Sequence, residues 1–215
     1  MTRSDFSVRG KKVVVVGAAR SGIAAAELLV RRGALVTLTE MRQTFDDADR
    51  LRAQGIALEL GGHRAESLAA ADLVVASPGV PLEQEVFDAA RERHVEIIGE
   101  LELASRWLKG RVIAITGTKG KSTTTTLIGR MLTAAHFTTA VGGNIGGPLS
   151  TQVDGSTPET FHVVEASSFQ LETTTTFKPW MAVWLNLADD HLDRHPSFDA
   201  YAEAKARVVV NQTAT

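Results

Sequence analysis

RVIAITGTKGKSTTTT, residues 111–126, joins three local patterns in direct succession. The apolar run from Val112 to Ile115 predicts a buried strand of a parallel sheet. Thr116 to Gly120 predict a glycine-rich turn. Beyond the turn, apolar residues recur at helical spacing, at Leu127, Ile128, Met131 and Leu132. A strand, a glycine-rich turn and a helix in this order can direct backbone N–H groups around phosphate oxygens.

The side chains that follow the turn fit the same role. Lys121 would reach the β- and γ-phosphates of a nucleotide, and the Ser122 hydroxyl would bind Mg²⁺. We therefore predict a phosphate-binding loop made of Gly117, Thr118, Lys119, Gly120, Lys121, Ser122 and Thr123. The common P-loop has four residues between its glycines, whereas this loop has only Thr118 and Lys119. The alternative is an ordinary strand-to-helix turn that contains a lysine and a serine.

Composition limits the possible classes of protein. The chain has 215 residues, 44% hydrophobic and 22% charged, which is typical of a globular protein with one large or two small domains. A net charge of -2 argues against a nucleic-acid partner, and the lack of cysteine excludes disulfides and thiolate chemistry. The first residues do not resemble a signal peptide, and no apolar run approaches the ~20 residues of a membrane span. We expect a cytoplasmic protein.

Strand and helix patterns alternate along the first half of the chain. Strands are expected at 11–17, 34–39, 56–60, 73–77 and 95–98, and helices at 23–30, 45–54, 83–93 and 100–108. This alternation predicts an α/β fold, with a Rossmann-like domain built on a parallel sheet over residues 1–110. The strand at residue 111 starts a fresh strand–turn–helix unit, so we expect a second α/β domain over residues 111–215.

The first strand ends in an incomplete dinucleotide-binding pattern. Between Gly17 and Gly22, Ala19 occupies the position where the middle glycine would let the backbone approach a pyrophosphate, so the pattern does not by itself predict a nicotinamide cofactor. Ligands of such sheets bind at the carboxyl ends of the strands. The candidate ligand residues at these ends are Ala19, Arg20, Ser21, Glu40, Met41, Arg42 and Gly79. For Ser77-Pro78-Gly79 a simple tight turn is an equal alternative.

The second half predicts strands at 138–141, 161–165 and 180–186, and a helix at 198–210. Glu165 ends a strand, where a carboxylate can bind Mg²⁺ or cap the following turn. His191 could bind metal or substrate, while spacing does not separate Asp189, Asp190 and Asp193. A surface position is expected for His63, His94, His136 and His162, and no functional role is expected for these four or for His195. By position alone, Lys205 would be a solvated residue on a helix.

Four motifs together resemble the Mur ligase family of peptidoglycan synthesis. They are GTKGKST at 117–123, EASSFQL at 165–171, Asn186 with DHLDRH at 190–195, and YAEAK at 201–205. The short Gly-Thr-x-Gly-Lys loop is shared with folylpolyglutamate synthetases. The SSFQL run and the Rossmann-like first domain are most similar to the members that add D-glutamate to UDP-N-acetylmuramoyl-L-alanine.

The resemblance implies an ATP-dependent ligase in which the L-alanine carboxylate becomes an acyl phosphate that the D-glutamate amine attacks. It implies catalytic roles for Lys121, His191 and Lys205, the last as a carbamylated lysine. It implies ATP and Mg²⁺ as cofactors, with Mg²⁺ near Ser122, Glu165, His191 and Lys205. Contacts to the phosphates and the muramoyl substrate are implied for Asn144, Ser167, Gln170 and His191. The loops of the first domain would hold the UDP end.

Two features depart from the family. Lys119 stands where members often have asparagine or another polar residue. The chain also ends inside the expected central domain, so we expect a truncated P-loop-type ATPase domain, no C-terminal domain, and a monomeric fragment without ligase activity. The alternatives are a sister ligase that adds L-alanine to UDP-N-acetylmuramate, or a UDP-sugar-binding module without catalytic activity.

Overall fold

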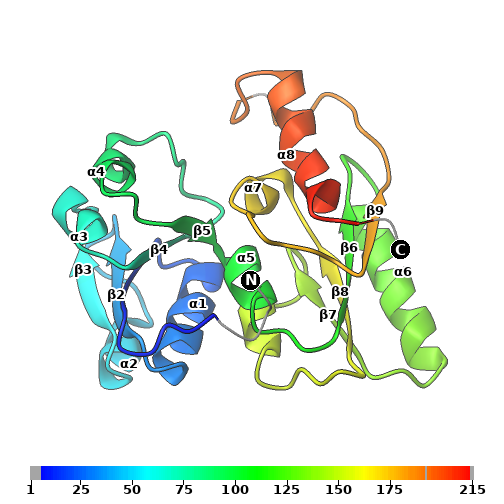
Figure 1. The fold of residues 1–215 in the computed structure, drawn as a ribbon, viewed down its shortest axis with the longest axis horizontal. Helices are drawn as coiled ribbons and strands as arrows, with labels where there is room; N and C mark the ends of the chain where they lie inside the picture. Colours follow the sequence, from blue (N-terminus) through cyan, green and yellow to red (C-terminus); the bar gives the residue numbers. More distant parts are fainter. Residues whose placement is uncertain (1–5, 192, 214–215) are drawn as a thin grey trace. The chain divides into compact units, whose positions relative to one another are not determined.

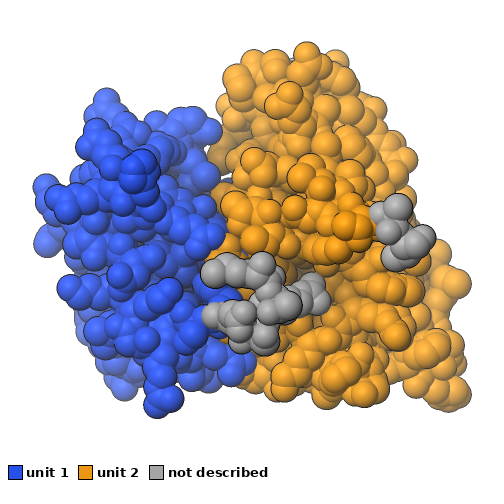
Figure 2. All heavy atoms as spheres, viewed as in Figure 1, with its two compact units in different colours: residues 1–103 blue, residues 104–215 orange. Residues whose placement is uncertain are grey.

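The computed structural model describes residues 6–191 and 193–213. It divides into two compact units, residues 1–103 and residues 104–215, shown in separate colours in Figure 2. This division falls inside the helix α5 (Glu100–Ser105), before the boundary expected at residues 110 and 111. Each unit is an α/β fold around its own all-parallel sheet, as predicted.

The first unit contains a five-stranded sheet in the order β3-β2-β1-β4-β5. Its strands are β1 (Lys12–Val16), β2 (Leu35–Glu40), β3 (Ala57–Leu60), β4 (Leu73–Ala76) and β5 (Ile97–Gly99). The helix α1 (Arg20–Arg31) packs on β1, β2 and β4. The apolar residues of β1 and β4 are buried because parallel sheets are covered on both faces.

The short helices of this unit differ most from expectation. The helix expected at 45–54 is reduced to α2 (Ala48–Ala53), and α3 (Ala65–Ala69) was not expected. The helix expected at 83–93 is wrong in its first part, because Gln84 is extended; the chain instead forms a 3-10 turn, η1 (Glu85–Phe87), and α4 (Asp88–Glu92). Each of these segments is too short to be stable as an isolated helix, so packing against the rest of the unit decides its length.

The second unit contains a four-stranded sheet in the order β7-β8-β6-β9 (Figure 1). Its strands are β6 (Arg111–Thr116), β7 (Thr139–Gly143), β8 (Phe161–Glu165) and β9 (Met181–Trp184). The helices are α6 (Lys121–Ala134), the 3-10 turn η2 (Leu149–Gln152), α7 (Ser168–Leu171) and α8 (Phe198–Val210). Of the apolar residues of α6, Ile128 and Leu132 pack on the sheet, whereas Leu127 and Met131 are 55% and 62% exposed.

The surface position expected for His162 is wrong. His162 lies in the middle of β8 and is buried, with Nδ1 at 2.7 Å from Gln152 Oε1 and Nε2 at 2.8 Å from Ser156 Oγ. Ser156 Oγ also accepts the N–H groups of Lys109 and Gly110. The Ser156 hydroxyl hydrogen therefore points to Nε2, and the neutral ring donates from Nδ1. Burial lowers the pKa of His162 to about 4.

No helix within residues 6–191 and 193–213 is both long enough and apolar enough to span a bilayer.

Candidate active site

The loop between β6 and α6 has the predicted order of strand, turn and helix. Gly120 has a φ of 82°, a left-handed conformation that glycine adopts without strain, and it directly precedes the first helical residue, Lys121. The first N–H groups of α6 have no acceptor within the helix, so they are available to an anion. Lys119, Ser122 and Thr123 are exposed around this helix start.

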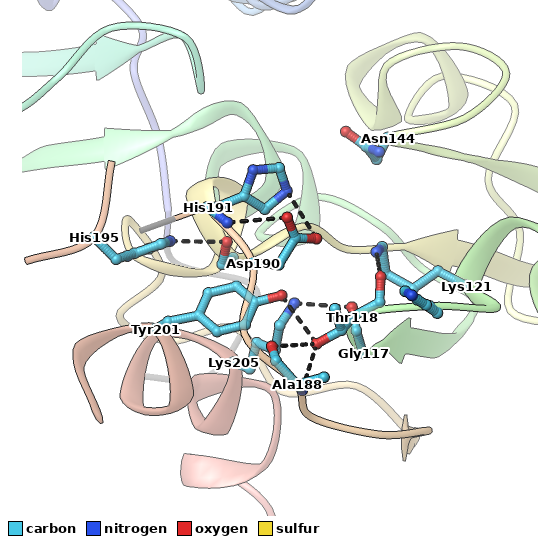
Figure 3. Close-up of polar contacts among 12 residues, drawn as sticks. Gly117, Thr118, Lys121, Asn144, Ala188, Asp190, His191, His195, Tyr201 and Lys205 are labelled. Carbon is cyan, nitrogen blue, oxygen red and sulfur yellow. Dashed lines mark hydrogen bonds and ion pairs between the residues drawn. The ribbon is translucent and has the colours of Figure 1, made fainter. Parts of the chain in front are cut away.

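Contacts from later parts of the chain hold this loop. Thr118 is buried, and its Oγ1 lies 3.0 Å from Ala188 N and 3.2 Å from the Tyr201 hydroxyl (Figure 3). The Asn186 side chain bonds to the N–H groups of Thr118 and Lys119. The Lys121 ammonium folds back onto Thr118 O at 2.9 Å. The segment from β9 to α8 therefore shapes the loop.

The environment of Lys205 differs most from the solvated environment that its position in a helix predicts. It is 1% exposed, and its Nζ donates to Gly117 O at 2.9 Å while lying 4.4 Å from the centre of the Tyr201 ring (Figure 3). Burial, together with the positive charge of Lys121, lowers the pKa of Lys205 to about 8, although Asp190 opposes the shift. The solvated position is wrong because this face of α8 packs toward the loop.

Glu165 ends β8 in register with Ile115, one residue before the end of β6. The residue is 1% exposed, and its Oε1 accepts a hydrogen bond of 2.7 Å from Asn144 Nδ2. Its buried Oε2 has no hydrogen-bond partner within the described part of the chain. Asn144 is also fixed through its main chain, since its N–H donates to Glu165 O. A buried carboxylate oxygen beside a phosphate loop fits a hard cation.

His191 lies on the turn that follows Asp190. Its φ of 54° is unusual for a residue other than glycine, and its side chain is 46% exposed, with Nε2 at 3.7 Å from Asp190 Oδ2. Its ring meets Phe169 edge to face. His195 is buried instead, bonded to Ser168 Oγ at 3.0 Å and paired with Glu172, as a structural histidine would be.

Ser167 and Gln170 form a capping box at the start of α7. Ser167 Oγ accepts the N–H of Gln170, and Gln170 Oε1 accepts the N–H of Ser167. Both predicted substrate residues therefore have a local structural role that the sequence analysis missed. The signal was present, since a serine followed three residues later by glutamine is a recognised helix start.

In the first unit, the strand ends carry a tight polar network. Glu40 is 8% exposed; its Oε2 accepts the N–H of Ala18 at 2.8 Å, and its Oε1 accepts Arg42 Nε at 3.1 Å. Burial alone would raise the pKa of Glu40, but hydrogen bonds from Arg42 and Ala18 outweigh it and lower the pKa to about 2. Glu40 thus ties together two of the loops predicted to bind substrate.

The other predicted residues of this unit follow the strands β1, β2 and β4. Arg20 and Ser21 form the first turn of α1 after Ala19, and Met41 is 63% exposed. Gly22 is required by packing, because a Cβ there would lie 1.9 Å from Gly17 O. Gly79 is in a turn closed by Val80 N and Ser77 O at 2.9 Å. His63, expected at the surface, is half-buried, and its Nδ1 lies 2.7 Å from Thr39 Oγ1.

In the part of the chain that is described, no three His, Asp, Glu or Cys side chains lie close enough together to hold a metal ion. Among its described residues, the second unit combines a loop with free helix N–H groups, two lysines and one buried carboxylate oxygen without a partner, that of Glu165.

Two family models match the chain. The model described as the Mur ligase middle domain matches residues 115–215, and the model described as the Mur ligase MurD-like N-terminal domain matches residues 11–99.

Curated relatives match nearly all of the chain. The UDP-N-acetylmuramoylalanine--D-glutamate ligase of Acidobacterium capsulatum is 50% identical over 211 residues, which are 97% of this chain and 46% of the relative. The protein of the same name from Geobacter metallireducens is 48% identical over 213 residues, 98% of this chain and 47% of the relative. The chain spans about half the length of these relatives.

A solved structure supports the fold. The UDP-N-acetylmuramate:L-alanyl-gamma-D-glutamyl-meso-diaminopimelate ligase from Neisseria meningitides superposes with a TM-score of 0.61. The match covers 96% of this chain and 69% of that protein at 20% identity, so it speaks to the fold alone.

Proposed function

Because this chain belongs to the Mur ligase family, matching its N-terminal and middle domains over residues 11–99 and 115–215, we propose that it is part of an ATP-dependent ligase that forms an amide bond. The proposed reaction adds D-glutamate to UDP-N-acetylmuramoyl-L-alanine, because relatives at 50% and 48% identity carry that name. With ATP as co-substrate, the reaction would take place in the cytoplasm.

The observation that carries the proposal is the meeting of the phosphate loop and Glu165 at the carboxyl ends of β6 and β8. The first N–H groups of α6 and the Lys121 ammonium would bind the β- and γ-phosphates of ATP. Gly117, Thr118, Lys119 and Gly120 shape this cradle, with Ser122 and Thr123 on the first turn of the helix.

The residues present fit Mg²⁺. Magnesium is usually held by one or two carboxylates together with phosphate and water oxygens, so Glu165 Oε2 and the Ser122 hydroxyl suffice on the protein side. We propose His191 as a further contact, close to the phosphates. Bound Mg²⁺ neutralises negative charge on the phosphate oxygens during transfer. The buried Lys205 amine, next to the loop at Gly117 O, is the proposed carbamylation site and would then offer oxygens in place of its nitrogen.

The chemistry proceeds in two displacements. The L-alanine carboxylate attacks the γ-phosphorus of ATP, forming an acyl phosphate and releasing ADP. The neutral amine of D-glutamate then attacks the acyl carbon, phosphate leaves, and the nitrogen releases one proton to solvent as the amide forms. Lys121 would contact the phosphates both before and after the phosphoryl transfer of the first step. Asn144 orients the Glu165 carboxylate through its 2.7 Å hydrogen bond.

We assign the UDP end of the substrate to the first unit. The loops at Ala19–Ser21, Glu40–Arg42 and Gly79 end neighbouring strands of one sheet, where ligands of such folds bind. Since the Glu40 carboxylate already accepts Ala18 N–H and the Arg42 guanidinium, its part is to hold these loops in place. Ser167 and Gln170, as a rigid capping box, would offer their remaining polar atoms to the muramoyl group.

Calorimetric titration of this chain distinguishes the proposed substrate from its alternative. Binding of UDP-N-acetylmuramoyl-L-alanine that is at least tenfold tighter than binding of UDP-N-acetylmuramate supports the D-glutamate-adding reaction. The reverse order would favour the sister ligase that adds L-alanine. Equal binding of both, with no Mg²⁺-dependent ATP binding, would favour a UDP-sugar-binding module without catalytic activity.

A further inference from the structure

Asn186 follows β9, and its side chain lies against the loop between β6 and α6. Its Oδ1 accepts the N–H groups of Thr118 at 3.1 Å and Lys119 at 2.9 Å. Its Nδ2 donates to Lys119 O at 3.0 Å. Its main-chain oxygen also accepts the Thr118 N–H at 3.2 Å and Trp184 Nε1 at 3.1 Å. All three side-chain bonds therefore go to two adjacent residues of the loop.

Asparagine matches this arrangement better than its close analogues. One end of its amide accepts and the other donates, as two N–H groups and one carbonyl oxygen on the loop require. Aspartate would keep the acceptor but would place a second oxygen against Lys119 O. Alanine would remove all three bonds. The amide orientation follows from these partners, since a flipped amide would point hydrogens at two N–H groups.

The contact also determines which N–H groups of the loop remain for a ligand. With the N–H groups of Thr118 and Lys119 bonded to Asn186, the available donors are those at the start of α6. Two further bonds hold the loop from the same side, from Ala188 N to Thr118 Oγ1 at 3.0 Å and from Lys205 Nζ to Gly117 O at 2.9 Å. Asn186 thus fixes the peptide that precedes Gly120 in the sequence.

We propose that Asn186 is a positioning residue that holds the phosphate loop in its binding conformation before the nucleotide arrives. This inference rests on the proposed function, since it gives Asn186 a part in ATP binding. Preorganised donors bind more tightly because the ligand does not have to order them.

The first test measures the loop without any ligand. Amide hydrogen exchange in Asn186→Ala should increase at Lys119 by at least about tenfold, because this amide loses its acceptor, whereas the Thr118 amide keeps the main-chain oxygen of residue 186 and should change less. Asn186→Asp keeps the acceptor, so its exchange rate should lie between those of the unaltered chain and Asn186→Ala. Asn211→Ala is the matched control, since it removes two side-chain bonds to backbone oxygens, of Thr175 and Phe177, away from the loop. Unchanged exchange at Lys119 in Asn186→Ala would overturn the inference.

The second test measures binding of Mg-ATP by calorimetry. Asn186→Ala should weaken binding at least about tenfold, whereas Asn211→Ala should leave it within about twofold. Asn186→Asp should bind no better than Asn186→Ala, because it adds a negative charge next to the phosphates. The two measurements thus rank the variants differently, which a loss of stability alone would not produce. Wild-type affinity in a folded Asn186→Ala variant would overturn the inference.

The two tests also keep the two proposals apart. If the unaltered chain shows no Mg-ATP binding while the exchange result holds, ATP binding by this chain is refuted and Asn186 still orders the loop. If the chain binds Mg-ATP and Asn186→Ala binds it equally well, the ATP site stands and the role of Asn186 in binding is refuted.

Discussion

At the scale of single residues, Glu165 is proposed to contribute to Mg²⁺ binding but little to the stability of the fold. One carboxylate oxygen accepts from Asn144, while the other is buried without a partner among the described residues. A buried, unpaired oxygen adds nothing to stability, so Glu165→Gln should leave the free energy of unfolding within about 1 kcal/mol of the original. The same change should weaken Mg²⁺-dependent ATP binding by at least about tenfold, because a hard cation prefers the charged oxygen.

The control for this prediction is Glu159→Gln, which alters an exposed carboxylate before β8. It should change neither quantity. Denaturant unfolding and calorimetry measure the two effects separately. Unaltered Mg²⁺-dependent binding in Glu165→Gln would show that the unpartnered oxygen does not face the cation.

His162 predicts a specific acid sensitivity. Its pKa is lowered from 6.5 to about 4 by burial, so the unfolded chain binds more protons between these values than the folded chain does. The contribution to stability is fully present above pH 6.5 and is lost as the pH falls toward 4. The loss should reach about 2–3 kcal/mol in the free energy of unfolding.

The pH dependence of denaturant unfolding tests this. His162→Asn should be less stable at neutral pH and should show a flatter decline between pH 6.5 and 4. His136→Asn, at an exposed histidine with a φ of 62°, should keep the original slope. An identical slope in the His162 and His136 variants would rule out the buried neutral imidazole.

The sequence predicted the roles of some of these residues but not the burial of others. The glycines and Lys121 were predictable because their spacing defines the loop. The burial of Lys205 was not, since a lysine in a helix gives no local sign of which face meets the protein. The burial of His162 could have been predicted, because the expected strand at 161–165 belongs to a parallel sheet, and such sheets are covered on both faces.

At the scale of secondary-structure elements, the capping box of α7 gives a coupled pair. Ser167→Ala and Gln170→Ala should each destabilise the second unit by about 1 kcal/mol, because each removes one acceptor of a backbone N–H and both remove the 3.2 Å bond from Ser167 Oγ to Gln170 Oε1. The double variant should lose clearly less than the sum of the two. A double-mutant cycle from denaturant unfolding measures this, and additive losses would show that the two side chains act independently.

Long and strongly patterned elements were predicted well. The helix α8 was expected at residues 198–210 and spans Phe198–Val210, and each of the predicted strands is present. The short segments α3, α7 and η2 were missed because four or five residues carry too little periodicity to show a pattern. The apolar spacing of α6 identified the helix, yet Leu127 and Met131 face away from the sheet.

At the scale of the whole molecule, two α/β units of different sheet order carry different proposed ligands. The order β3-β2-β1-β4-β5 brings the first unit's loops to the carboxyl ends of β1, β2 and β4. In the second unit β6 lies between β8 and β9, so the phosphate loop lies between Glu165 and the segment that carries Asn186. Alternation of strands and helices predicted both folds, whereas the strand order came only from the structure.

The most direct measurement is a calorimetric titration of this chain with ATP, with Mg²⁺ present and then chelated, repeated on Lys121→Ala. We predict binding that needs Mg²⁺ and weakens at least about a hundredfold in Lys121→Ala, because the variant removes the ammonium proposed to bind the phosphates. Binding of UDP-N-acetylmuramoyl-L-alanine should be unchanged in the same variant, which serves as the control for folding. ATP binding that is indifferent to both Mg²⁺ and Lys121, or no ATP binding by a folded chain, would contradict the account.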